Sequence, residues 1–157
     1  MGSLPSRILV GLDGSAAALE AADYALALAL RLGAKVTFVA VVDEQVVADM
    51  DRFGLIKRES ARTVLEREMR HYTDEASAHA RQMGVECDEL VELGDVVRTL
   101  VDVAVSGGYD LLVVASRSMR SLERLAAGQV TARLVDFSPI PILVYKSTSR
   151  DVLGGVS

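Results

Sequence analysis

Residues 8–15 read ILVGLDGS, a stretch that joins a buried strand to the start of a helix. Its first part belongs to the run RILVGL at Arg7–Leu12, which is apolar and rich in β-branched residues, as a strand covered on both faces is. A short turn then leads to Ser15, a residue type that favours the N-cap position of a helix. We therefore predict a strand at Arg7–Leu12 and a helix at Ala16–Leu32.

The same alternation of strand and helix continues along the chain. The connection Glu44–Arg58 has weak periodicity and is predicted to be a mobile loop with room for one helical turn, long enough to close over a cleft. Alternating strands and helices form parallel βαβ units, so the predicted fold class is an α/β three-layer sandwich with helices on both faces of the sheet. The remaining predicted strands are Lys35–Val42, Val85–Glu92 (an edge strand), Asp110–Ala115 and Ile142–Tyr145, and the remaining helices are Ser60–Met83, Val96–Val105 and Gln129–Phe137.

One face of the long predicted helix is apolar. Its apolar residues recur at spacings of three and four, which is typical of a helix that packs against a core or a dimer partner. We predict packing, and not a cofactor site, for this stripe. It comprises Leu65, Met69, Tyr72, Ala76, Ala80 and Met83.

Length, charge and cysteine content exclude several classes of protein. The 157 residues are the size of one domain, and 17 basic against 22 acidic residues give a net charge of −5, which disfavours nucleic acid as a partner. The single cysteine, Cys87, cannot form an internal disulfide, which suits a reducing cytoplasm. The most apolar stretch, Ala21–Leu32, is shorter than the ~20 residues of a membrane span, so we predict a cytoplasmic protein without membrane attachment.

The motifs of common enzymes and metal sites are absent from the sequence. It contains no G-x-G-x-x-G, G-x4-G-K-[S/T], G-x-S-x-G or H-E-x-x-H pattern. Its two histidines, His71 and His79, lie eight residues apart on the long predicted helix, where they do not face each other. We predict no enzyme, no catalytic residues and no metal site.

Any ligand site is expected at one edge of the sheet. Parallel α/β sheets bind ligands beyond the carboxyl ends of their strands, where the strand order reverses. In this chain that rule brings together the segments Leu12–Ser15, Val42–Glu44 and Ala115–Ser118.

The chain resembles the universal stress protein family over roughly Arg7–Lys146. The resemblance is carried by ILVGLDGS at 8–15, VTFVAVVD at 36–43, GDVVRTLVDVA at 94–104, YDLLVVASRS at 109–118 and AAGQVTARLVDFSPIPILVYK at 126–146. It implies a five-stranded parallel sheet of order 3-2-1-4-5 and a homodimer paired through the last strand. We expect one domain at residues 7–146, between a flexible start at 1–6 and a flexible tail at 147–157.

The last predicted strand supports a dimer on physical grounds as well. It is apolar on both faces although it should lie at the edge of the sheet, and such an edge invites pairing with a second copy of itself. The predicted dimer residues are Ile142, Leu143, Val144 and Tyr145.

Members of this family often bind ATP or AMP through a phosphate loop of pattern G-x2-G-x9-G-[S/T]. The four motif positions fall on Ala115, Ser118, Gly128 and Gln129, and only Gly128 keeps the family's residue. Side chains at the first two positions obstruct the close approach of backbone to phosphate that glycine allows. Two other features favour anion binding. Arg117 makes the loop cationic, and helix N-terminal amides at Gly128–Thr131 would be available to an anion.

Two functions from different classes remain. The first is a non-catalytic regulatory protein whose cleft binds an adenine nucleotide, ATP or AMP, or another anion, with a weakened phosphate grip. The second is a dimeric interaction module whose cleft is empty. Asp13 is either a contact of adenine or a residue that only supports the entry to the helix. Gly128 is either part of the phosphate loop or a residue that only separates two helical turns. The candidate nucleotide residues are Leu12, Asp13, Gly14, Ser15, Val42, Asp43, Ala115, Ser116, Arg117, Ser118, Gly128, Gln129, Val130 and Thr131.

Overall fold

The computed structural model describes residues 3–116 and 124–147, and for residues 124–129 it describes the backbone alone. Its centre is a parallel sheet of five strands in the order β3-β2-β1-β4-β5, which confirms the predicted order 3-2-1-4-5. The strands are β1 (Arg7–Leu12), β2 (Lys35–Asp43), β3 (Cys87–Gly94), β4 (Leu111–Ala115) and β5 (Ile142–Tyr145).

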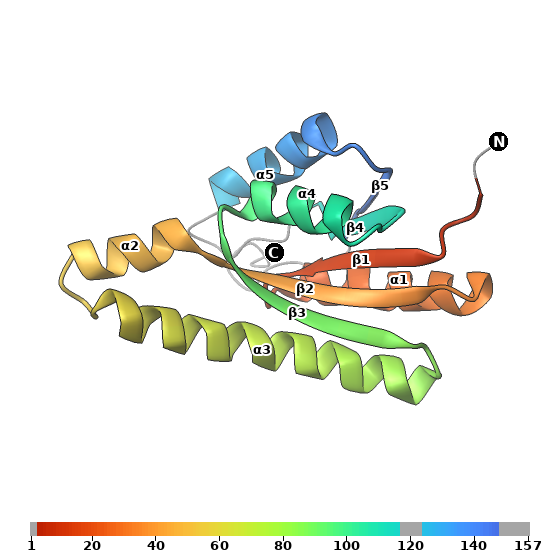
Figure 1. Ribbon diagram of the computed structural model, residues 1–157, viewed down its shortest axis with the longest axis horizontal. Coiled ribbons are helices and arrows are strands. Elements are labelled where there is room, and N and C mark those ends of the chain that lie inside the picture. Colours follow the sequence, from red (N-terminus) through yellow and green to blue (C-terminus); the bar gives the residue numbers. More distant parts are fainter. Residues whose placement is uncertain (1–2, 117–123, 148–157) are drawn as a thin grey trace, which may run out of the picture.

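Helices cover both faces of this sheet. Figure 1 shows α1 and α3 on one face, α4 and α5 on the other, and α2 beyond the end of β2. The helices are α1 (Ala16–Leu32), α2 (Glu44–Arg52), α3 (Arg58–Met83), α4 (Val96–Ser106) and α5 (Arg124–Phe137). No helix in the described ranges is long and apolar enough to cross a bilayer.

Alternation along the strands divides the core between the two faces. Ile8 and Val10 of β1 belong to the cluster under α1 and α3, whereas Leu9 belongs to the cluster under α4 and α5. Successive residues of a strand point to opposite faces, so a strand covered on both sides must be apolar throughout. This explains why the run that begins at Ile8 shows no alternation of polar residues.

The first helix is anchored at both ends and lies close to the sheet. The Ser15 Oγ accepts a hydrogen bond from the N–H of Ala18 (3.1 Å), and Gly33 ends the helix with a φ of 66°, as the sequence predicts. The face toward the sheet is mainly alanine, which lets the helix axis approach the strands closely. Its buried residues are Ala17, Ala18, Ala21, Ala22, Ala25, Leu26 and Ala29.

Several elements differ from the sequence prediction, and one of them is α3, which begins at Arg58, two residues before the predicted Ser60. The segment Glu44–Arg52 is a helix and not a loop, because Asp43 caps it through a hydrogen bond from the N–H of Gln45 (2.9 Å) and its apolar face packs on α3. Strand β3 lies two residues further along the chain than predicted, since its register is set by pairing with β2. Helix α5 begins at Arg124, five residues before the predicted start.

The two ends of the domain make contacts with its core elements. The Oγ of Ser147 donates a hydrogen bond to Glu20 of α1, and the ring of Tyr145 lies 5.3 Å from that of Tyr24. The outer parts of the predicted flexible ends, residues 1–2 and 148–157, lie outside the described residues.

One carboxylate ties the start of β1 to the start of β4. Asp110 accepts hydrogen bonds from the N–H groups of Ser6 and Arg7 (3.1 and 3.0 Å to Oδ1) and from the Ser6 hydroxyl (3.0 Å to Oδ2). Burial acts to raise the pKa of Asp110, but these hydrogen bonds outweigh it and hold the pKa below its ordinary value of 3.8. The ionised carboxylate therefore stabilises the fold above that pH, and its contribution is lost as pH falls through the lowered pKa.

Replacement of this carboxylate should destabilise the domain in a pH-dependent way. We expect Asp110→Asn to lower the free energy of unfolding by about 1–2 kcal/mol near neutral pH, because an amide accepts fewer and weaker hydrogen bonds. The difference from wild type should shrink as urea unfolding is repeated at progressively lower pH, because the wild-type carboxyl loses its charge as the pH falls through its lowered pKa. Asp102→Asn, at an exposed position of α4, is the control and should leave both values unchanged.

Candidate functional site

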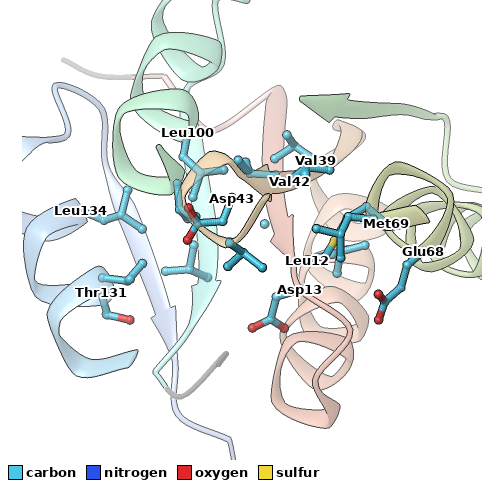
Figure 2. Close-up of a pocket in the computed structure, with 17 residues that line it drawn as sticks. Leu12, Asp13, Val39, Val42, Asp43, Glu68, Met69, Leu100, Thr131 and Leu134 are labelled. Atoms are coloured by element: carbon cyan, nitrogen blue, oxygen red, sulfur yellow. The ribbon is translucent and has the colours of Figure 1, made fainter. Parts of the chain in front are cut away.

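A cavity of about 230 Å³ lies at the carboxyl ends of β1, β2 and β4. Figure 2 shows its lining, with Thr131 and Leu134 of α5 on one side, Met69 and Glu68 of α3 on the other, and Asp13 between them. The site is thus where the strand order reverses, the place that the sequence predicts for a ligand.

The walls of the cavity are apolar. Strand β2 supplies Val39 and Val41 to the lining, and Leu100, Val114 and Leu134 of the same apolar cluster line it as well. An aliphatic lining favours a flat, uncharged ring system over a compact polar ion, because the ring loses little hydration on burial. This part of the cavity can hold a heterocyclic base.

The polar lining is mainly acidic. Asp13, Asp43 and Glu68 line the cavity together with the hydroxyl of Thr131, and no lysine or arginine lines it within the part of the chain that the structure describes. The N–H of Ser15 donates to Asp13 Oδ1 (2.9 Å), and the N–H of Gln45 donates to Asp43 Oδ1 (2.9 Å). Asp13 therefore supports the helix entry and also faces the cavity, and its contact with adenine stays a prediction.

Six of the fourteen predicted site residues line this cavity. They are Leu12, Asp13, Val42, Asp43, Val130 and Thr131. Of the others, Ser15 caps α1 and is buried, and Ala115 lies wholly in the core. Ser116 stands in the turn after β4, where its N–H donates to the carbonyl of Tyr145 (2.9 Å).

The segment that should hold phosphates is described only in part. Arg117 and Ser118 lie outside the described residues, and Gly128 and Gln129 are known for their backbone alone. Because α5 begins at Arg124, Gly128 lies inside the helix, so its predicted place between two helical turns is wrong. The free N–H groups of a helix are those of its first four residues, so the amides of Gly128–Thr131 are not the exposed donors that the sequence suggested.

Several lining residues were missed by the sequence analysis. Leu65, Glu68 and Met69 belong to α3, whose apolar stripe was assigned to packing alone, and Val46 belongs to the segment predicted as a loop. The stripe packs against the core through its later part, at Ala76 and Ala80, while its first two members face the cavity. The spacing that revealed the stripe could not show where along the helix the core ends.

The turn after β1 is packed against an aromatic ring. Gly14 has a φ of +86°, and a Cβ added there would lie 2.3 Å from Cζ of Tyr72 on α3. The left-handed backbone favours glycine at this position, and a side chain there would also have to displace the end of the Tyr72 ring. The contact is one of those that join α3 to the turn beside the cavity.

Metal binding finds no support among the described side chains. No group of three or more His, Cys, Asp or Glu residues in those ranges is placed to hold a metal ion. His79 lies 2.9 Å from Asp23 and His71 lies 3.9 Å from Glu75, both at exposed positions of the α1 and α3 surface.

Comparison with known proteins identifies relatives over the whole domain. A model of the universal stress protein family matches residues 5–146. Universal stress protein YxiE of Bacillus subtilis is 25% identical over 146 residues, which cover 90% of this chain and 99% of the relative. Universal stress protein MJ0531 of Methanocaldococcus jannaschii is 26% identical over 149 residues, which cover 95% and 86% of the two chains.

Solved structures share the fold. Hypothetical protein MJ0577 superposes with a TM-score of 0.78 at 21% identity and covers 92% of this chain and 98% of its own. A universal stress protein in complex with cAMP has a TM-score of 0.64 at 24% identity, covering 94% of this chain and all of its own. A protein of the same family from Arabidopsis thaliana with AMP bound has a TM-score of 0.62 at 15% identity, covering 92% and 94%.

The contact between Gly14 and Tyr72 predicts a large effect of a small substitution. We expect Gly14→Ala to lower the free energy of unfolding by about 2–4 kcal/mol, because the strained φ and the overlap with the ring add to each other. Gly84→Ala is the matched control: Gly84 has a φ of +79° but nothing within 4 Å of its added Cβ, so only the backbone term of about 1 kcal/mol applies. Equal losses in urea unfolding would show that the ring contact contributes nothing.

Proposed function

The chain belongs to the universal stress protein family, and from that premise we propose that it is a non-catalytic regulatory protein whose cavity binds the nucleoside part of an adenine nucleotide and holds the phosphates weakly. The observation that carries the proposal is the lining of the cavity. It combines apolar side chains, which suit a base, with three carboxylates, and none of the described lining residues has a basic side chain. Such a lining suits a neutral, donor-bearing group better than a triphosphate.

The size of the cavity supports the same ligand. Pockets for drug-sized ligands measure about 300–1,000 Å³. At about 230 Å³ this cavity suits a base with part of its sugar more than a whole ATP molecule. The relatives of the same fold solved with cAMP and with AMP carry ligands of one phosphate each, which is consistent with this choice.

The residues at the phosphate-loop positions support a weak phosphate grip. Ala115 stands at the first glycine position of the family pattern, but it is buried in the core cluster under α1 and does not line the cavity, so the proposed weak grip rests on two later positions. Ser118 and Gln129 replace a glycine and a short hydroxyl side chain of that pattern. Each change removes a feature that brings backbone N–H groups or a hydroxyl close to phosphate oxygens.

Titration calorimetry with adenosine, AMP and ATP tests this proposal. We expect AMP to bind at least as tightly as ATP, since the additional phosphates gain few contacts. Ser118→Gly combined with Gln129→Ser should raise ATP affinity about tenfold relative to AMP by restoring the family pattern. Gln82→Ser, at an exposed position of α3 outside the loop and the cavity lining, is the control and should leave the ratio unchanged.

Two results would contradict the nucleotide proposal. ATP bound more than tenfold tighter than AMP by the wild-type protein would show that the phosphate grip is intact. If no adenine compound binds, and denatured protein releases nothing that absorbs near 260 nm, the dimeric interaction module becomes the better function.

We further propose that the protein acts as a homodimer in the cytoplasm and pairs through β5. This strand forms one edge of the sheet, and Val144 is 37% exposed there. Phe137 and Val135, near the end of the preceding helix, are also exposed apolar residues, at 66% and 55%. An apolar strand at an open edge is a natural surface for a second copy.

Light scattering at micromolar concentration should therefore give a mass near two chains. We expect Val144→Lys to reduce the mass to that of one chain, because a charge at the centre of a symmetric strand pair meets its own copy. Val105→Lys is the matched control, since Val105 is 55% exposed on α4 and lies away from β5. A wild-type mass of one chain would contradict the dimer.

A further inference from the structure

One wall of the cavity carries a carboxylate, Glu68, that lies outside the five sequence segments on which the resemblance to the family was based. Glu68 lies in the first half of α3 and is partly buried. Figure 2 shows its side chain on the side of the cavity opposite Thr131, with Asp13 between the two.

This carboxylate is held in place by contacts that run back to the sheet. The hydroxyl of Tyr72, one helical turn further along α3, donates a hydrogen bond of 2.6 Å to Oε1 of Glu68. That is a short distance, typical of a strong hydrogen bond to an ionised acceptor. The ring of Tyr72 packs over Gly14, at the end of β1, so tightly that no side chain fits between them. The position of Glu68 is thus tied to the turn that also carries Asp13.

The charge of the surroundings limits what Glu68 can bind. An ionised carboxylate only accepts hydrogen bonds, and Asp13 and Asp43 line the same cavity. A second anion beside these groups would be repelled, because like charges at short range in a partly buried site are weakly screened. A neutral N–H or O–H donor meets no such repulsion and adds a hydrogen bond to the carboxylate.

We propose that Glu68 is a specificity-determining residue, which accepts a hydrogen bond from an uncharged N–H or O–H group of the bound nucleoside. Tyr72 is its positioning residue. The inference rests on the proposed adenine-nucleotide function and names the part of the ligand that Glu68 recognises. Two groups of AMP have the required chemistry, the 6-amino group of the base and the hydroxyls of the ribose.

Calorimetry with AMP, IMP and 2′-deoxy-AMP separates these two sources. IMP replaces the amino group by an oxygen acceptor, and 2′-deoxy-AMP lacks one ribose hydroxyl. The wild-type protein should bind one of the two analogues at least about tenfold more weakly than AMP, because a buried acceptor then faces a second acceptor or loses its donor. The analogue that is rejected identifies the group that Glu68 contacts.

Variants then assign the preference to this side chain. Glu68→Met keeps the length of the side chain without a strong acceptor and should reduce the preference to less than about threefold, while Glu68→Gln, which keeps an amide oxygen, should preserve part of it. Tyr72→Phe should also weaken the preference, because the carboxylate loses its fixed position. Glu66→Met is the matched control on the same helix, since Glu66 pairs with Arg62 (2.8 Å) and does not line the cavity.

The outcomes separate this inference from the function on which it rests. Equal wild-type affinity for AMP and both analogues, or an unchanged preference in a folded Glu68→Met variant, would overturn the role of Glu68 and leave adenine-nucleotide binding intact. A wild-type protein that binds neither adenosine nor AMP would overturn both. Thermal unfolding of each variant confirms that a lost preference is not a lost fold.

Discussion

The structure depends on one constraint, that a parallel sheet must be covered on both faces. The strands of such a sheet are apolar on both sides, so each must be followed by a helix that crosses back over one face or the other. Every strand then points the same way, and all five carboxyl ends meet at one edge. The turns at that edge receive the acidic and small residues that the strands exclude, and the cavity lies among them.

The local pattern of the sequence predicted the strands and the first helix well, because their signals are complete within a few residues. Ser15 and Gly33 mark both ends of α1, and the run from Ile8 has the composition of a covered strand. The start of α5 and the helix at Glu44–Arg52 were missed for a different reason. In α2 only Val47 is buried, so the apolar periodicity is too short to detect, and the helix depends on its cap at Asp43 and on packing against α3.

The candidate site was predictable where it follows from strand direction and not where it follows from helix packing. Leu12, Asp13, Val42 and Asp43 directly end or follow strands, so topology alone brings them together. Glu68 reaches the cavity only because α3 crosses the sheet at a particular place, which follows from its packing on β2 and β3 together with the contact of Tyr72 with Gly14. In the sequence, Gly14 has the features of an ordinary turn residue, because the residues beside it give no sign of the contact with Tyr72, 58 positions further along the chain.

The buried alanine face of α1 limits the substitutions that this chain can accept during evolution. Six alanines on that face are between 0% and 7% exposed, which leaves no room for an added methylene without lifting the helix from the strands. Lifting it would displace the turn at Gly14 and, with it, the wall that α3 builds. Substitutions should therefore accumulate on the outward side of α1, at positions such as Tyr24 and Leu30. The inward side of the helix should change more slowly, even though none of its residues lines the cavity.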